Sequence, residues 1–334
     1  MRIGIDAMGG DHGIAEAVPG AVEAARTLEI PVTLFGQAEL IEEELRGINR
    51  AGLDISVVDC REVIETAEAP LQAIRQKKNS SMAQGFRSLR DGEIDAFVSA
   101  GNTGALVVGG SLIVGMMEGL RRPGLATTLP TVHMQPMVLV DAGASVDPRP
   151  EQLAEYAVVG SIYAEQILKR ESPRVALVNI GVEEEKGNEL TRKAYALLKN
   201  APIRFVGNVE ARELVSGDVD VAVADGFVGN VILKLAEGFG LGMFKMIQDE
   251  IRQSFLSRVG GLLVRPRLRR LKNLVDYASY GGAPLFGPTS PVIKCHGSSK
   301  RDAIKNGVRV AEEFVRLDVI HRMELRLGEL VEHV

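Results

Sequence analysis

Short apolar runs rich in β-branched residues alternate with helix-periodic segments from one end of the chain to the other. The predicted strands are residues 2–5, 31–35, 55–58, 96–99, 137–141, 174–179, 204–206 and 219–224. Between most of them lie segments with apolar residues at helical spacing, such as 151–170 and 189–199. This alternation predicts an α/β protein with a mainly parallel sheet in an α/β/α sandwich. In such sheets, ligands bind beyond the carboxyl ends of the strands.

No linker rich in proline or serine interrupts this alternation. We therefore predict a single catalytic α/β unit over residues 1–334, in which any two lobes are tightly joined. The stretch 96–117 carries no charge, which makes it a candidate membrane span. Only residues 104–117 of it are continuously apolar, which is too short for a bilayer and predicts a fully buried helix.

Two strand ends carry the same turn. Residues 99–105 and 224–230 each have the pattern of a strand end, a G-x-x-G turn and the start of an apolar helix. Unpaired backbone N–H groups at such turns suit a phosphate or an oxyanion. A single turn of this kind is more often structural, since glycine is also what any tight strand-to-helix turn requires. Several such turns at strand ends predict an anion site, and we expect these two to face a common cleft.

Two lysine-containing segments also suit an anion. Lys186 follows strand 174–179, beside Asn188, where it is either a phosphate-binding cation or the partner of the glutamates at 183–185. Two lysines precede Ser80, which is either an anion ligand or the N-cap of the next helix.

Residues 292–299 predict a strand that runs into the start of a helix. Alternation along the strand puts Lys294 and His296 on one face and Cys295 on the other, which argues against a Cys295–His296 nucleophile pair. Ser299 is followed three residues later by an aspartate, a spacing that resembles a capping box and predicts a structural role. His296 stays open between ligand contact and hydrogen bonding at the turn.

The segment 251–275 differs from the rest of the chain in charge. It contains seven Lys and Arg residues and no acidic residue, and its apolar residues fall at helical spacing. Pro266 is expected to break it into two amphipathic helices. Three interpretations stay open: contact with an anionic membrane surface, docking of an acidic partner protein, or packing on the body or a second subunit. The residues expected to make contact are Leu262, Leu263, Arg265, Arg267, Leu268, Arg269 and Arg270.

Composition narrows the classes of function. A net charge of −5 and only 4% aromatic residues argue against nucleic-acid binding. Cys60 and Cys295 form no C-x-x-C pair, which predicts a reducing cytoplasm. The five histidines are scattered without ligand spacing, so we predict no metal and no cofactor. Asp6 and Asp11 flank a Gly-Gly turn, where turn formation is favoured over Mg²⁺ binding.

The motifs, taken together and in order, resemble those of one family. They are Ile5-Asp6-Ala7-Met8-Gly9-Gly10-Asp11-His12, Lys78-Asn79-Ser80-Ser81-Met82, Ser99-Ala100-Gly101-Asn102-Thr103-Gly104-Ala105-Leu106, Thr128-Leu129-Pro130-Thr131, Asp141-Ala142-Gly143-Ala144, Lys186-Gly187-Asn188-Glu189-Leu190, Gly207-Asn208-Val209-Glu210-Ala211-Arg212, Asp225-Gly226-Phe227-Val228-Gly229-Asn230, Tyr280-Gly281-Gly282-Ala283 and Lys294-Cys295-His296-Gly297-Ser298-Ser299. The chain is thereby similar to the bacterial phosphate acyltransferases, or acyl-acyl carrier protein:phosphate transacylases. It departs from them at Gly13-Ile14, where Ala-Pro is expected, and at Cys295, where alanine is usual.

The resemblance implies a fold like that of phosphotransacetylases and isopropylmalate dehydrogenases, and a homodimer. It implies reversible transfer of a long fatty acyl chain from acyl carrier protein to inorganic phosphate, giving an acyl phosphate for phospholipid synthesis. It also implies a cytoplasmic enzyme associated peripherally with the inner face of the membrane, where the membrane-bound glycerol-3-phosphate acyltransferase is a candidate partner.

This chemistry suits a chain without an evident nucleophile. Phosphate is largely ionised near neutral pH, so we expect direct attack on the thioester and no covalent acyl-enzyme. We expect Lys186 and the 101–104 turn to hold phosphate, and Asn230 with the 226–229 turn to stabilise the oxyanion. The predicted site residues are Lys186, Asn230, His296 and Asp225 for catalysis, and Gly101, Asn102, Thr103, Gly104, Asn188, Gly226, Gly229, Ser80 and Ser298 for binding.

Two other classes of function compete. A decarboxylating dehydrogenase on a related fold would need an aspartate cluster for Mg²⁺ and substrate-binding arginines, a set that we do not find in the sequence. A membrane scaffold would use only the basic helices, and it would leave the Gly-Asn turns at the strand ends unexplained.

Overall fold

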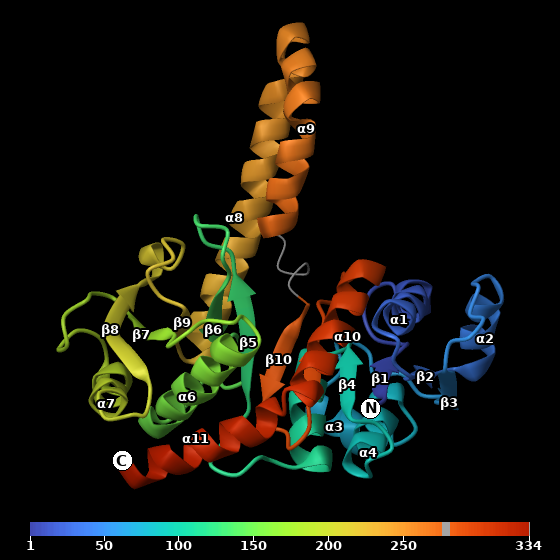
Figure 1. Ribbon diagram of the computed structural model, residues 1–334, viewed down its shortest axis with the longest axis horizontal. Coiled ribbons are helices and arrows are strands. Elements are labelled where there is room, and N and C mark those ends of the chain that lie inside the picture. Colours follow the sequence, from blue (N-terminus) through green and yellow to red (C-terminus); the bar gives the residue numbers. More distant parts are fainter. Residues whose placement is uncertain (276–280, 334) are drawn as a thin grey trace.

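Eleven strands form one sheet within residues 1–275 and 281–333, the part of the chain that the computed structural model describes (Figure 1). Their order is β3-β2-β1-β4-β11-β10-β5-β6-β9-β7-β8. They are β1 (Ile3–Asp6), β2 (Val32–Gly36), β3 (Ile55–Asp59), β4 (Ala96–Ser99), β5 (Gly124–Leu129), β6 (Met137–Val140), β7 (Arg174–Asn179), β8 (Arg204–Glu210), β9 (Val221–Val223), β10 (Ala283–Phe286) and β11 (Val292–Lys294). The predicted α/β class and all the predicted strands are confirmed.

Two parallel halves of the sheet meet at an antiparallel seam. β3, β2, β1, β4 and β11 are parallel on one side, and β6, β9, β7 and β8 are parallel on the other. β10 and β5, between them, pair antiparallel with their neighbours. The sequence pattern did not predict these two strands, because β10 contains Pro284 and β5 lies between Pro123 and Pro130, which obscure a strand pattern.

Helices cover both faces of the sheet. They are α1 (Ile14–Leu28), α2 (Ala38–Arg46), α3 (Pro70–Gln76), α4 (Ser81–Arg90), α5 (Thr103–Gly109), α6 (Pro150–Gln166), α7 (Glu189–Leu198), α8 (Gly226–Arg252), α9 (Phe255–Val275), α10 (Arg301–Arg316) and α11 (Val319–His333). Alternate residues of β4 show the two faces. Ala96 and Val98 belong to the core that includes residues of α1 and α10, whereas Phe97 packs on Phe86 of α4, with 5.2 Å between ring centroids.

The helix predicted over residues 104–117 is shorter than expected and only partly buried. α5 continues into one π-helical turn (Gly110–Val114) and ends at Gly115, whose φ is 101°. Leu106 is buried, but Leu112 is 61% exposed. The prediction of a fully buried helix is therefore wrong, because only one face of this segment packs on the core.

α8 and α9 form a hairpin that projects from the body (Figure 1). The predicted break at Pro266 is wrong, since α9 passes through this residue and the chain turns instead between Arg252 and Phe255. Proline removes one helical N–H donor. Leu262, whose carbonyl oxygen would accept that hydrogen bond, is exposed, so water can replace the donor.

α8 is, among the described residues, the one helix that is long and apolar enough to cross a membrane by length and composition. Its first turn is fixed on the body, and Phe227, Leu235, Phe239 and Met246 are all exposed. An apolar surface of this extent marks a site of contact with another surface.

Candidate active site

Three loops gather at one edge of the sheet, after the neighbouring parallel strands β6, β9 and β7. They are residues 141–145 after β6, residues 224–230 after β9 and residues 180–188 after β7. Carboxyl ends of adjacent parallel strands are where ligands of α/β proteins bind. Six of the predicted site residues lie at this edge, namely Lys186, Asn188, Asp225, Gly226, Gly229 and Asn230.

Asp141 organises the first of these loops. Its carboxylate is fully buried and accepts hydrogen bonds from the backbone N–H groups of Leu125, Gly143, Ala144 and Ser145, at 2.6–2.9 Å. Burial raises the pKa of Asp141, and the four amide donors oppose this rise. The loop therefore folds around a single side chain, which holds Gly143 against Asn230 of α8.

The 226–229 turn packs α8 directly onto this loop. A methyl group at Gly229 would lie 1.9 Å from the carbonyl oxygen of Asp141, and one at Gly226 would lie 2.6 Å from that of Ser145. The backbone N–H groups of the turn already have acceptors, since Gly226 donates to Ser145, Phe227 and Val228 donate to the Asp225 carboxylate, and Gly229 donates to the Asp225 carbonyl. These glycines permit close packing, and Asp225 caps α8.

Asn230 follows this turn as an exposed residue of α8. Among the residues that the structure describes, none forms a hydrogen bond with its side-chain amide. An exposed amide beside a glycine loop leaves two N–H donors for a substrate.

Lys186 extends from the loop after β7. The loop is held by Asn179, whose side-chain amide donates to the Lys186 carbonyl oxygen at 3.1 Å, and by Asn188, whose side chain caps α7. Glu184 pairs with Lys199 instead of with Lys186. Within the described part of the chain, the exposed Lys186 ammonium has no acidic partner within 4 Å, so the interpretation as a glutamate partner fails.

A second group of loops gathers after β1, β4 and β11, in the other half of the sheet. Asp6 accepts a hydrogen bond from the Ser99 hydroxyl at 2.7 Å, and the buried Lys294 donates to the carbonyl oxygens of Ala100 and Cys295. Burial lowers the pKa of Lys294 to about 8. Lys294 therefore ties the end of β11 to the turn after β4.

The 101–104 turn uses its polar groups internally. The Asn102 side chain caps α5 at Ala105 and donates to the carbonyl oxygens of residues 65, 66 and 68. The Gly101 N–H donates to Ser99, and a methyl group at Gly104 would lie 2.4 Å from Pro70. The backbone N–H of Thr103, at the first position of α5, has no intrahelical acceptor.

Ser80 has the role of a helix cap. Its buried hydroxyl accepts from the Ala83 N–H and donates to the Lys77 carbonyl oxygen. Ser299, predicted to cap α10, does not: Lys300 occupies the N-cap position and has no side-chain cap. The Ser299 hydroxyl oxygen is buried without a hydrogen-bond partner among the described residues, and the Ser299 N–H donates to the His296 carbonyl oxygen.

His296 lies at the turn after β11. Its Nδ1 accepts from the Ser298 N–H at 3.2 Å and lies 2.8 Å from the Ser298 hydroxyl, so the neutral ring carries its proton on Nε2. Burial, and next the positive charge of Lys234, lower the pKa of His296 below its ordinary value of about 6.5. The imidazole is therefore neutral near pH 7.

The two G-x-x-G turns do not share one strand edge. Five inter-strand steps separate β4 from β9, and the three antiparallel pairings among them make β9 run opposite to β4, so the carboxyl ends of these two strands lie at opposite edges of the sheet. Lys186, after β7, is one step farther, so within one chain it belongs with Asn230 and not with the 101–104 turn. α8 runs between the two groups, since it starts beside Asp141 and the charge of its residue Lys234 acts on His296.

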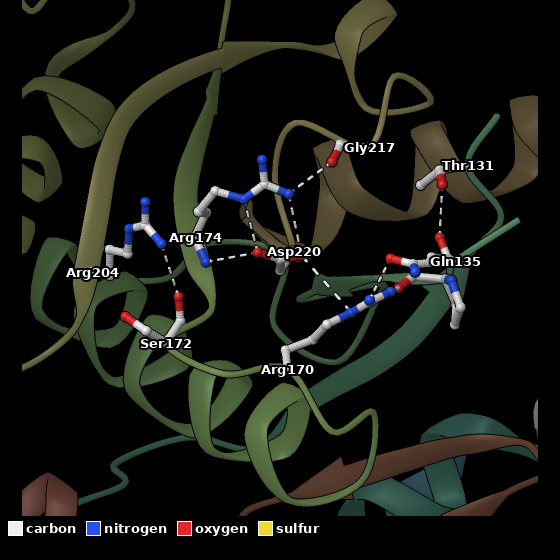
Figure 2. A network of polar contacts seen from close by, with 9 residues as sticks. Thr131, Gln135, Arg170, Ser172, Arg174, Arg204, Gly217 and Asp220 are labelled. Carbon is white, nitrogen blue, oxygen red and sulfur yellow. Dashed lines mark hydrogen bonds and ion pairs between the residues drawn. The ribbon is translucent and has the colours of Figure 1, made fainter. Parts of the chain in front are cut away.

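A third polar cluster lies at the opposite ends of β7 and β9 (Figure 2). Arg174 donates to both oxygens of Asp220 and to the Gly217 carbonyl oxygen, and Arg170 bonds to Gln135. A cavity of about 290 Å³ lies beside it, lined among others by Thr131. Arg170 also forms an ion pair with Asp220 at 3.8 Å, although its Nε has no hydrogen bond among the described residues. The network braces the amino ends of β6, β9 and β7.

The basic residues of α9 are on the projecting hairpin. Leu262, Leu263, Arg265, Arg267 and Arg270 are exposed, and Leu268 is half-buried. The side chain of Arg269 and residue Tyr280 lie outside the described part of the structure.

Among the residues that the structure describes, His, Cys, Asp and Glu side chains form no group of three that could hold a metal ion.

Comparison with known proteins identifies the family. A family model described as a fatty acid synthesis protein matches residues 1–322. Proteins named phosphate acyltransferase from Bacillus cereus (strain B4264) and Geobacillus thermodenitrificans (strain NG80-2) are each 46% identical, over 96% and 98% of this chain and 96% and 99% of their own. The chain belongs to the phosphate acyltransferase family. It is a transferase enzyme.

Solved structures agree with this family at the level of the fold. A phosphotransacetylase from Streptococcus pyogenes superposes with a TM-score of 0.61 at 17% identity, covering 99% of this chain and 94% of its own. A branched-chain phosphotransacylase from Enterococcus faecalis V583 gives 0.58 at 13% identity, covering 94% and 99%. The predicted phosphotransacetylase-like fold is confirmed.

The site of this phosphate acyltransferase family member includes residues that sequence reasoning did not single out. Asp141 and Asn179 hold the two loops at the strand ends, and the positive charge of Lys234 acts on His296. Asp141 is the last residue of a predicted strand and belongs to a family motif, and these two features of the sequence could have identified it. Lys234 follows Asn230 by four residues, the spacing of two side chains on one helix face.

Proposed function

We propose that this enzyme transfers a fatty acyl group from an acyl carrier protein thioester to inorganic phosphate, which gives an acyl phosphate for phospholipid synthesis. One observation carries the proposal: Lys186 and Asn230 follow adjacent parallel strands beside a glycine loop, and among the described residues the first has no acidic partner and the second no side-chain hydrogen bond. The names of the relatives supply the substrate class.

In this proposal Lys186 holds the phosphate. An ammonium on a flexible stem is a common ligand of phosphate, and the neighbouring N-terminus of α7 adds the positive end of a helix dipole. Asn188 is the N-cap of that helix and fixes the loop geometry. The proposed phosphate site therefore leaves out Ser80 and the 101–104 turn, whose polar side chains hold the fold together.

Asn230 stabilises the oxyanion in the tetrahedral intermediate. Its Nδ2–H groups are donors on a rigid helix whose start is locked on Asp141, which is the preorganisation that such a site requires. Removal of one oxyanion donor typically costs about 3 kcal/mol of transition-state stabilisation. Asp225 acts by capping α8, so it positions Asn230.

Phosphate attacks directly, without an acyl-enzyme. The thiols offer no nucleophile, because burial raises the pKa of Cys60 to about 12 and that of Cys295 to about 11. Cys295 is 1% exposed, and its sulfur would lie 2.7 Å from a methyl group at Gly307. Cys295 is a packing residue.

The α8–α9 hairpin contacts other molecules in this proposal. The exposed apolar face of α8 pairs with a second subunit, which accounts for the predicted homodimer. The exposed leucines and arginines of α9 contact the inner membrane surface or the acidic carrier protein. The enzyme is then cytoplasmic and bound peripherally to the membrane. This location is near a membrane-bound acyltransferase that consumes the acyl phosphate.

Replacement of Lys186 by alanine tests the phosphate site. We expect Lys186→Ala to raise the KM for phosphate by about tenfold or more, because a charged hydrogen bond contributes roughly 1.5–3 kcal/mol. Lys199→Ala is the matched control, since this lysine pairs with Glu184 of the same loop. Normal turnover and a normal phosphate KM in Lys186→Ala would refute the site.

A further inference from the structure

α8 carries a second polar residue one turn beyond Asn230. Lys234 and Asn230 are four residues apart, so their Cβ atoms lie about 5–6 Å from one another on one helix face. Lys234 is 54% exposed, and its ammonium forms an ion pair with Glu237 at 2.8 Å. Glu237 is 17% exposed, and its second oxygen is buried without a hydrogen-bond partner among the described residues.

The charges of Lys234 and Glu237 act on residues in the loops of the other half of the sheet. Lys234, Glu237, Lys294 and Asp11 are the charged groups that act on His296, and Lys234 also acts on Lys294. The Asp11 N–H donates to the Gly297 carbonyl oxygen at 2.7 Å, which fixes Asp11 beside the same turn. Lys234 therefore lies one helical turn beyond the proposed oxyanion donor Asn230, and its charge acts on the His296 turn.

Acyl transfer from a thioester creates charge in two places. The carbonyl oxygen becomes negative first, and the departing sulfur becomes negative when the C–S bond breaks. A thiol has a pKa of about 8.5, so the leaving group departs as a thiolate, which a nearby cation stabilises until a proton neutralises it. Lys186 and Asn230 are already assigned to the phosphate and the oxyanion, which leaves the sulfur without a partner.

We infer that Lys234 is a catalytic residue that stabilises the departing carrier thiolate, and that Glu237 is the positioning residue that aims its ammonium. The inference rests on the proposed function. A phosphate oxygen forms the new bond to the acyl carbon, the C–S bond breaks, and its electron pair stays on sulfur. The proton that the attacking HPO₄²⁻ carried is released by the acyl phosphate and ends on the thiolate, so no co-reactant is needed.

The dependence of rate on the leaving group tests this assignment. Lys234→Gln should lower kcat with the alkyl thioester of the carrier by about 10²–10³-fold, the loss typical of one removed electrostatic donor. With an aryl thioester of the same acyl chain, whose thiolate is much more stable, the loss should shrink to a few-fold. Lys245→Gln on the same helix is the control and should retain wild-type rates, and Lys234→Arg should restore part of the activity.

Equal losses with both thioesters would overturn the inference and leave the proposed function intact. Failure of the wild-type enzyme to form acyl phosphate would instead refute the proposed function itself. Circular dichroism of Lys234→Gln should match the wild type, because the Lys234 side chain is 54% exposed. Thermal denaturation measures the cost of leaving Glu237, which is 17% exposed, without its partner.

A titration independent of activity tests the geometry. Lys234→Gln should raise the pKa of His296, measured by NMR of the imidazole, because a nearby positive charge is removed. Glu237→Gln should lower it for the opposite reason. If neither substitution moves the His296 titration, Lys234 does not face this turn, and the inference fails.

Discussion

Single glycines of α8 have very different surroundings. A methyl group at Gly229 would lie 1.9 Å from a backbone oxygen, whereas one at Gly238 would meet nothing within 4 Å. We expect Gly229→Ala to destabilise the protein by more than about 4 kcal/mol or to prevent folding. Gly238→Ala should stabilise it by about 1 kcal/mol, because alanine favours helices. Thermal denaturation compares the two, and similar melting temperatures would contradict the packing of α8 on Asp141.

Asp220 gives a second prediction for a single residue, this one dependent on pH. Burial alone would raise its pKa, but hydrogen bonds from Arg174 outweigh burial and lower it (Figure 2). A carboxylate with a lowered pKa in the folded state stabilises the protein above pH 3.8, and this stability is lost as the pH falls through the folded-state pKa.

We therefore expect Asp220→Asn to lower the free energy of unfolding at pH 7 by about 1–3 kcal/mol. Urea unfolding of both proteins between pH 7 and pH 3 should show this difference shrinking at the acidic end. A difference that stays constant with pH would mean that the ion pair with Arg174 does not stabilise the fold.

Residue identity alone could not separate caps from ligands. Ser80, Asn102 and Asp225 all stand at helix starts, and serine, asparagine and aspartate suit both a cap and an anion site. The sequence placed each at the correct helix terminus, but only hydrogen-bond partners decide its role. Lys186 was ambiguous for the same reason, because the pairing of Glu184 with Lys199 depends on the folded loop.

At the scale of elements, the parallel strands were predictable and the seam between them was not. Apolar runs of β-branched residues identified β1, β7 and their parallel neighbours, since buried parallel strands have continuous apolar sequences. β5 and β10 reverse the direction of the sheet, and their prolines hid them. Because this seam is not evident in the sequence, the sequence alone does not reveal that the two G-x-x-G turns occupy different strand edges.

The α8–α9 hairpin carries the prediction at this scale. A neutral variant at Arg267, Arg269 and Arg270 should bind anionic liposomes more weakly, by about 1 kcal/mol per removed charge near the surface, or should raise the KM for the carrier thioester. Liposome sedimentation and steady-state kinetics measure the two effects. A variant with unchanged liposome binding and an unchanged KM would exclude both roles for the basic face of α9. Lys300→Gln, outside the hairpin, serves as a control.

At the scale of the whole molecule, α8 extends from the loops of one half of the sheet toward those of the other half. It begins against the loop after β6, carries Asn230 and Lys234, and continues into the exposed hairpin. A contact on the hairpin would therefore act on the same helix that holds Asn230, the proposed oxyanion donor. This arrangement gives a physical reason for the 27-residue length of α8, which a helix that served only the core would not need.

Quenched-flow mass spectrometry of the purified enzyme with an acyl carrier thioester tests the central claim, direct attack by phosphate. Without phosphate, we predict that the carrier thioester stays intact and that the mass of the enzyme does not change. With phosphate, we predict acyl phosphate in amounts equal to the free carrier. An acylated enzyme that forms without phosphate, and that phosphate then consumes at the rate of turnover, would contradict this account.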